Sequence, residues 1–284
     1  MATLTPKVLL DGIVFPEGPR WHKGKLWFSD IFGKKVMTVD EKGHSEVIAT
    51  VPERPSGLGW LPDDRLLIVS MHNQQLLRLD PDGLHTVADV KSLVKGDIND
   101  MVVDPQGRAY IGSMGYDVFA GESHGLGNIV MVTPDGKARV VADNMEMPNG
   151  PVITPDHKTL IVAESFGHRL TAFDIAADGS LSGRRVFAEL GEGVPDGICL
   201  DAEGAVWVSS PFTHEFIRVR QGGVAAERVP LSEGKLAVAC MLGGEDRRTL
   251  FLLTAETTME ELSKGNSKGY IETVRVDVPG AGLP

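Results

Sequence analysis

Four polar side chains, those of Glu17, Asn99, Asn149 and Asp196, occupy equivalent positions in related segments of the chain. All four offer carboxylate or amide oxygens, and each heads an apolar segment, where a polar group without a partner costs free energy. Carboxylates that converge repel one another unless a cation lies between them, and oxygen ligands favour hard cations. These residues therefore predict a site for one divalent cation, with Ca²⁺ preferred over Mn²⁺, Mg²⁺ or Zn²⁺.

The segments around these residues are copies of one repeat. A short first strand, a corner rich in Pro, Asp and Gly and a second apolar strand recur six times, and the head positions lie 39 to 50 residues apart. The six heads are Glu17, Ser56, Asn99, Asn149, Asp196 and Ala239. Such a period, with about four strands per copy, is typical of a β-propeller, whose first strands line a central channel. The sequence thus predicts one all-β domain over residues 1–284, a six-bladed β-propeller with its heads at the axis.

The last copy of the repeat lacks an outer strand of its own. Its third strand lies at 270–278, and no outer strand follows it. The segment VLLDG at 8–12 has the apolar, small and acidic pattern of the outer strands in the other copies, such as VIATV at 47–51. We expect this N-terminal strand to complete the last blade, which closes the ring and protects its edges.

The composition is that of a globular chain with a sizeable core, since 42% of the residues are hydrophobic. A formal net charge of −11 argues against nucleic acid as a partner, which would require a basic surface. No apolar run approaches the length of a membrane span, and the N-terminus lacks the regions of a signal peptide. We therefore expect a cytoplasmic monomer or small homo-oligomer without a membrane partner. Cys199 and Cys240 are expected as buried, reduced side chains.

Two segments, 115–127 and 257–269, are longer than a blade requires. We expect the first to form a lid or a pocket wall, and the second to form either a similar wall or a surface feature with a helical turn in TMEELSK. The side chains expected to contact a substrate lie in the first loop, beside the heads and after the second strands: Asp97, Asn99, Met114, Tyr116, His124 and Phe212.

Four motifs, taken in order, resemble those of the SMP-30/gluconolactonase family, also called regucalcin-like. They are EGPRW around Glu17, NDMVVDPQGRAYIGSM around Asn99, PNGPVITPD around Asn149 and PDGICLDAEGAVWVS around Asp196. The resemblance covers essentially the whole chain. It implies a six-bladed propeller in which Glu17, Asn149 and Asp196 hold the metal, and Asn99 lies beside it and binds substrate or metal. It further implies that Asp196 is the general base of a metal-dependent hydrolase of small lactones.

The chain departs from the gluconolactonases two residues before Asn99. There the resemblance places an arginine that binds sugar hydroxyls, and this chain has Asp97. The departure favours a substrate with fewer hydroxyl groups than an aldonolactone. Two alternatives stay open: hydrolysis of a phosphotriester or fluorophosphate at the same site, since stabilisation of an oxyanion also serves phosphorus, and a calcium-binding propeller without catalysis.

Overall fold

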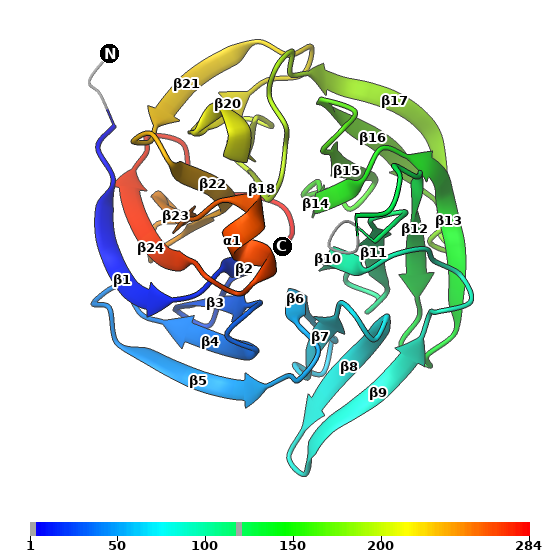
Figure 1. Cartoon of the computed structure of the whole chain (residues 1–284). Coiled ribbons are helices and arrows are strands. Elements are labelled where there is room, and N and C mark those ends of the chain that lie inside the picture. The colour runs from blue at the N-terminus through cyan, green and yellow to red at the C-terminus, as the bar shows by residue number, and fades with distance from the viewer. Residues whose placement is uncertain (1–3, 118–120) are drawn as a thin grey trace.

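The computed structural model describes residues 4–117 and 121–284. Within them, 24 strands form six four-stranded antiparallel sheets, which surround a central axis as the blades of a propeller (Figure 1). Each blade runs from an inner strand beside the axis to an outer strand at the rim. The all-β, six-bladed fold expected from the repeat is thereby confirmed.

The first three blades follow one another along the chain, and each is built from four consecutive strands. From axis to rim, the first blade comprises β2 (Pro16–His22), β3 (Lys25–Asp30), β4 (Lys35–Val39) and β5 (Ser45–Thr50). The second comprises β6 (Pro55–Trp60), β7 (Leu66–Ser70), β8 (Gln75–Asp80) and β9 (Gly83–Asp89). The third comprises β10 (Ile98–Val103), β11 (Ala109–Ser113), β12 (Gly127–Val132) and β13 (Ala138–Met145).

The next two blades repeat this plan, and the sixth combines both ends of the chain. The fourth comprises β14 (Pro148–Ile153), β15 (Thr159–Glu164), β16 (Arg169–Ile175) and β17 (Leu181–Glu189). The fifth comprises β18 (Ile198–Leu200), β19 (Val206–Ser210), β20 (Glu215–Val219) and β21 (Ala225–Pro230), with a 3₁₀ turn η1 (Pro211–Thr213). The sixth comprises β22 (Lys235–Gly243), β23 (Thr249–Glu256), β24 (Lys268–Arg275) and β1 (Lys7–Ile13), with the helix α1 (Met259–Ser263).

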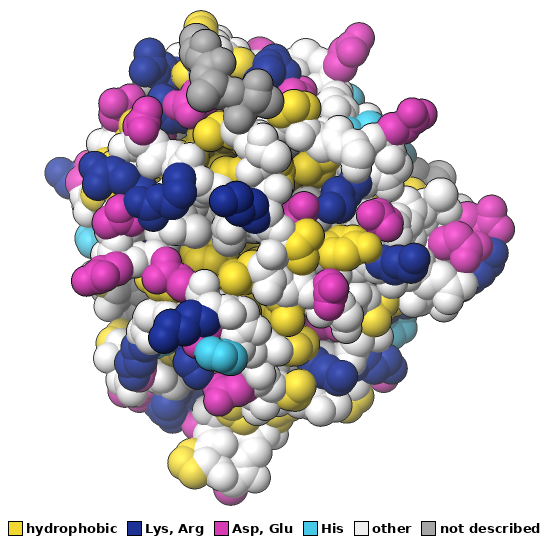
Figure 2. All heavy atoms as spheres, turned by 90° about the vertical axis from the view of Figure 1, so that its left-hand side faces the viewer, with side chains coloured by type: hydrophobic (Ala, Val, Ile, Leu, Met, Phe, Trp, Pro, Cys, Tyr) yellow, Lys and Arg dark blue, Asp and Glu magenta, His cyan; other side chains and the backbone are white. Residues whose placement is uncertain are grey.

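The ring closes through β1, as the sequence predicts. β1 pairs antiparallel with β24, from Lys7 opposite Thr273 to Ile13 opposite Gly269, and the two strands lie side by side at the rim in Figure 1. A core cluster that includes Phe28, Trp207 and Phe251 joins blades one, five and six, and so seals the ring where its ends meet. Acidic and basic side chains are interspersed on the side of the molecule that carries β1 (Figure 2). The excess of acidic residues therefore forms no single patch on that side.

The inner strands are buried on both faces because each blade packs against two neighbours. All residues of the inner strands β10 and β14 are buried. So are all residues of the second strands β7 and β11, which consist mainly of apolar residues rather than alternating apolar with polar ones. The outer strands show the opposite pattern, since β17 exposes most of its residues to solvent. Packed inner strands hold the axis rigidly, which suits a site built there.

The C-terminal segment crosses the end of the channel opposite to the heads. Leu283 forms backbone hydrogen bonds with Ile153, at the far end of β14, and Ala281 donates to the carbonyl of Leu200. Cys199 and Cys240 lie buried on β18 and β22 without a disulfide, their Sγ atoms 3.8 Å apart. No helix among the described residues is long and apolar enough to cross a membrane.

Candidate functional site

One irregularity recurs at the head of the inner strands. The pairing of β2 with β3 shifts by one residue between Glu17 and Arg20, and β6, β10 and β14 shift at the same place. A bulge of this kind interrupts the alternation of side chains and redirects one of them. Glu17, Asn99 and Asn149 are each the second residue of their strand, and Asp196 lies two residues before β18. The repeated bulge thus explains why equivalent residues of different blades face the axis.

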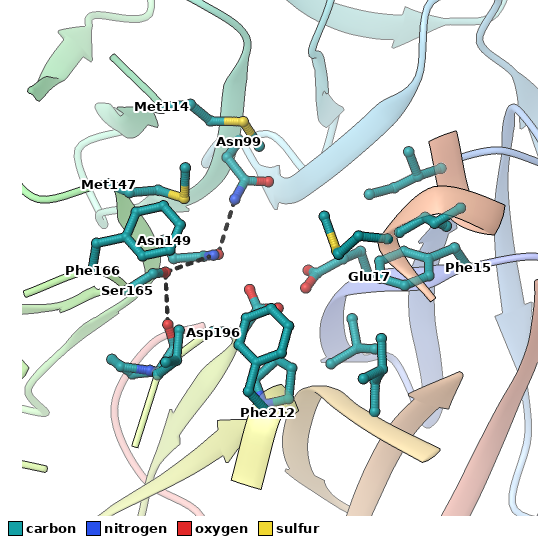
Figure 3. Close-up of a pocket in the computed structure, with 18 of the residues that line it drawn as sticks. Phe15, Glu17, Asn99, Met114, Met147, Asn149, Ser165, Phe166, Asp196 and Phe212 are labelled. Atoms are coloured by element: carbon teal, nitrogen blue, oxygen red, sulfur yellow. Dashed lines mark hydrogen bonds between the residues drawn. The ribbon is translucent and has the colours of Figure 1, made fainter. Parts of the chain in front are cut away.

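The two amides at the axis are held by a chain of hydrogen bonds that runs through four blades. Ser56 Oγ donates to Asn99 Oδ1 at 3.0 Å, and Asn99 Nδ2 donates to Asn149 Oδ1 at 2.9 Å. Asn149 Nδ2 donates to Ser165 Oγ at 3.3 Å, and Ser165 Oγ donates to the carbonyl of Pro195 at 2.7 Å. Figure 3 shows the bonds that join Asn99, Asn149 and Ser165, with the carboxylates of Glu17 and Asp196 pointing into the space beside them. The predicted metal ligands therefore meet at one place.

The protein itself does little to neutralise the negative charge of the two carboxyl groups at the axis. Glu17 is only 3% exposed, and burial, followed by the negative charges of Asp196 and Asp100, raises its pKa well above the ordinary value. Burial and the charge of Asp100 raise the pKa of Asp196 to about 8, although this side chain is open to the pocket. Both groups would ionise more readily beside a cation.

A buried ion pair lies beneath these carboxyls. Arg20 Nη2 lies 2.6 Å from Asp100 Oδ1, and Arg20 Nε donates to the carbonyl of Leu58 at 2.8 Å. Because Arg20 is already engaged with Asp100 and with backbone carbonyls, it cannot also neutralise both Glu17 and Asp196. The atoms at the axis that could bind a metal are carboxylate and amide oxygens, which fit a hard divalent cation such as Ca²⁺.

A pocket of about 150 Å³ opens above these polar groups. Its floor contains Glu17, Asn99, Asn149 and Asp196, and the expected contacts Met114 and Phe212 line its walls. Several further lining residues were not expected from the sequence: Phe15, Ile31, Phe32, Met71, Met147, Ser165 and Leu236. A signal for some of them exists, because Ile31, Met71, Met114 and Ser165 each directly follow the second strand of their blade.

Three of the expected substrate contacts do not line this pocket. Asp97 is buried beside it, with Oδ1 3.2 Å from His72 Nδ1 and Oδ2 3.6 Å from Arg54 Nη1. The ring of Tyr116 lies against that of His124 in a tilted arrangement, with centroids 5.5 Å apart, and neither ring is part of the lining.

His124 lies beside a residue of the pocket wall but is not itself part of the lining. Its ring centroid is 6.1 Å from that of Phe166, which does line the pocket, and its Nε2 lies 3.0 Å from a carboxylate oxygen of Glu146. A substrate-binding role for Asp97, Tyr116 and His124 thus stays a prediction. Residues 118–120 of the same loop lie outside the described residues.

A second group of possible ligands lies far from the axis, on the hairpin of β8 and β9. Suitable atoms of Asp80, Asp82 and His85 lie within 4.8 Å of one another. Each carboxylate already has a partner, since Arg78 Nη2 lies 2.6 Å from Asp80 and His85 Nε2 lies 2.8 Å from Asp82. The hairpin's own ion pairs account for this group.

The raised pKa of Asp196 predicts how the stability of the metal-free protein depends on pH. In the unfolded chain an aspartate ionises near 3.8, whereas Asp196 in the folded protein keeps its proton up to about 8. Between these values the folded state binds more protons, so its stability falls as the pH rises. We expect the melting temperature of EDTA-treated protein to fall between pH 5 and pH 8, and to fall less steeply for Asp196→Asn. Equal slopes for both proteins would contradict the assignment.

Comparison with known proteins places the chain in a family. The family model described as the SMP-30/Gluconolactonase/LRE-like region matches residues 15–256. The chain is 30% identical over 254 residues to regucalcin from Xenopus laevis, which covers 86% of this chain and 84% of that protein. It is 25% identical over 279 residues to 6-deoxy-6-sulfogluconolactonase from Pseudomonas putida, which covers 95% of this chain and 94% of that protein.

A solved structure shows the same fold. It is that of a calcium-binding protein, regucalcin, from Agrobacterium tumefaciens, with a TM-score of 0.81 and 24% identity. The similarity covers 100% of this chain and 99% of that one. The resemblance seen in the motifs is confirmed, and the chain belongs to the SMP-30/gluconolactonase/LRE-like family.

Proposed function

We propose that the chain is a hydrolase of small lactones that depends on a divalent cation bound by Glu17, Asn149 and Asp196. The observation that carries the proposal is the pair of carboxyls with raised pKa, Glu17 and Asp196, which share the floor of an open pocket with oriented amides. A propeller that served only as a scaffold would have no need to place such groups around one axis. The lactonase name of a relative supports the same reaction class.

The proposed reaction assigns one role to each residue at the floor of the pocket. A divalent cation bound there would polarise the lactone carbonyl and lower the pKa of a bound water. Asp196, ionised when positive charge lies beside it, accepts the proton of the attacking water. The water oxygen bonds to the carbonyl carbon, the ring C–O bond breaks, and Asp196 returns the proton to the leaving alkoxide. Asn99, which bonds to Ser56 and Asn149, would donate its second amide hydrogen to the lactone.

Acid release tests the proposal directly, because opening a lactone yields a hydroxy acid. EDTA-treated protein is assayed by pH-stat with γ-butyrolactone, γ-nonalactone and δ-gluconolactone, before and after addition of Ca²⁺, Mn²⁺, Mg²⁺ or Zn²⁺. We expect metal-restored hydrolysis of at least one lactone, above a blank that holds the metal alone. No hydrolysis of any lactone by folded, metal-loaded protein would refute it.

Two further arms of the assay address the alternatives. Release of fluoride from a fluorophosphate, without lactone hydrolysis, would assign phosphorus chemistry to the same site. Calcium binding by calorimetry, without turnover of either substrate, would favour a calcium-binding propeller, a role suggested by the calcium-binding regucalcin among the structural neighbours. Either outcome would retain the proposed cation site and would replace only lactone hydrolysis as its function.

A further inference from the structure

We propose that the pocket selects lactones that carry an apolar substituent, an alkyl chain or an aryl group, beside the lactone ring. The inference rests on the proposed function and specifies its substrate class. It assigns the ester group to the polar floor of the pocket and the substituent to the walls above it.

The walls of the pocket are apolar in every blade. Among the lining residues that the structure describes, fifteen of twenty have apolar side chains. Many of them are the first or second residue after the second strand of a blade. They are Ile31, Phe32, Met71, Met114, Phe166, Pro211 and Phe212. Antiparallel pairing brings the end of each second strand to the head of its first strand. The repeat therefore builds an apolar collar directly above the polar floor.

The polar side chains of the pocket already bond to one another or face the proposed cation site. The five polar lining residues that the structure describes are Glu17, Asn99, Asn149, Ser165 and Asp196. Asn99, Asn149 and Ser165 bond to one another, and the two carboxyls face the place of the cation. The ring hydroxyls of an aldonolactone would leave water for a collar that offers them no described side-chain partner, which is unfavourable. An apolar substituent would instead gain from leaving water.

The mouth of the pocket exposes apolar side chains that a substituent could cover. Phe166 is 40% exposed, Phe212 is 53% exposed and Met259 is 46% exposed, and all three line the pocket. Figure 3 shows Phe166 and Phe212 on the sides of the pocket that carry Asn149 and Asp196. Exposed apolar side chains gathered around a cavity are typical of a binding site for an apolar group.

The insertion in blade six adds to this surface. α1 is capped by Thr258, whose Oγ1 accepts from the backbone N–H of Glu261 at 3.2 Å. The helix contributes Met259 and the buried Leu262 to the lining. The expected helical turn in TMEELSK is thus confirmed, and it forms a wall of the pocket. A cavity of about 150 Å³ is comparable to an apolar protein cavity that accepts benzene.

A series of γ-lactones with alkyl chains of increasing length tests the inference. Metal-loaded protein is assayed with γ-butyrolactone, γ-hexalactone, γ-octalactone and γ-nonalactone, and with δ-gluconolactone. We expect kcat/KM to rise about fourfold for each methylene that the collar buries, until the chain reaches solvent, and δ-gluconolactone to be the poorest substrate. A flat series, or δ-gluconolactone as the best substrate, would overturn the inference while leaving the proposed function intact.

Binding of non-hydrolysable γ-alkyl-γ-lactams, measured by calorimetry, separates the two proposals. Affinity that rises with chain length, together with no hydrolysis of any lactone, would support the apolar selectivity and overturn the proposed activity. Lactams that show no dependence of affinity on chain length would overturn the selectivity, whatever the activity.

Phe212→Ser tests the collar itself, because this side chain is half exposed and its removal should leave the fold intact. We expect the ratio of kcat/KM for γ-nonalactone to that for γ-butyrolactone to fall about tenfold, because γ-butyrolactone lacks the alkyl chain that Phe212 would cover. Val224→Ser, which removes an exposed apolar side chain from a turn outside the pocket, is the matched control. Equal losses on both lactones would contradict a role for Phe212 in binding the substituent.

Discussion

Asp196→Asn is expected to lower kcat for lactone hydrolysis by about 10²- to 10⁴-fold, the usual contribution of a general base. The variant keeps the size of the side chain and an oxygen that can face the cation, but it cannot accept a proton from water. Because Asn149 already provides a hydrogen bond to Asp196, the local structure should change little. The measurement is kcat at saturating metal, with metal occupancy determined separately by calorimetry.

The interpretation of Asp196→Asn depends on separating proton transfer from metal binding. We expect the variant to bind the cation more weakly but to saturate at higher concentration, and to remain slow when saturated. Asp143→Asn, which changes an exposed carboxylate on the outer strand β13, should match the parent protein in both respects. Full kcat in the metal-saturated Asp196→Asn variant would show that another group accepts the proton.

The residues at the floor of the pocket could be predicted from the sequence because the repeat predicts where equivalent residues lie in space. Glu17, Asn99 and Asn149 occupy the same position in their blades, and a ring of blades brings equal positions to one axis. No single Asn-Gly or Asp-Gly pair would have justified the prediction, since such pairs usually form turns. The closure of the ring by β1 followed from the same argument, because an incomplete last copy needs a partner strand.

The walls of the pocket were harder to predict, since loops and side-chain direction decide them. Tyr116 and His124 belong to the long loop of blade three, yet neither lines the pocket, whereas Phe166, which lies beside His124, does. Asp97 is adjacent in sequence to the inner strand β10 but turns to His72 and Arg54 instead. Phe15 and Leu236 belong to no motif, and only the folded ring brings them to the lining.

Glu17→Gln is expected to weaken metal binding by about 100-fold or more. Loss of residues that merely support metal ligands costs about 10- to 100-fold in affinity, and Glu17 contributes one of the two carboxylates at the floor of the pocket, where we propose that the cation binds. The same variant should stabilise the metal-free protein, because burial and the negative charge of Asp196 oppose ionisation of Glu17 and raise its pKa.

Opposite effects on the two forms distinguish a metal ligand from a structural carboxylate. Calorimetry should report the loss of affinity, and thermal unfolding should report a higher melting temperature in EDTA but a lower one in limiting Ca²⁺. Glu41→Gln, an exposed change on the turn between β4 and β5, controls for the loss of one charge. A Glu17→Gln variant with unchanged metal affinity would remove Glu17 from the site. A Glu17→Gln variant that is less stable than the parent protein in EDTA would mean that Glu17 stabilises the inner strands. Its burial would then have a structural role rather than a role in binding the cation.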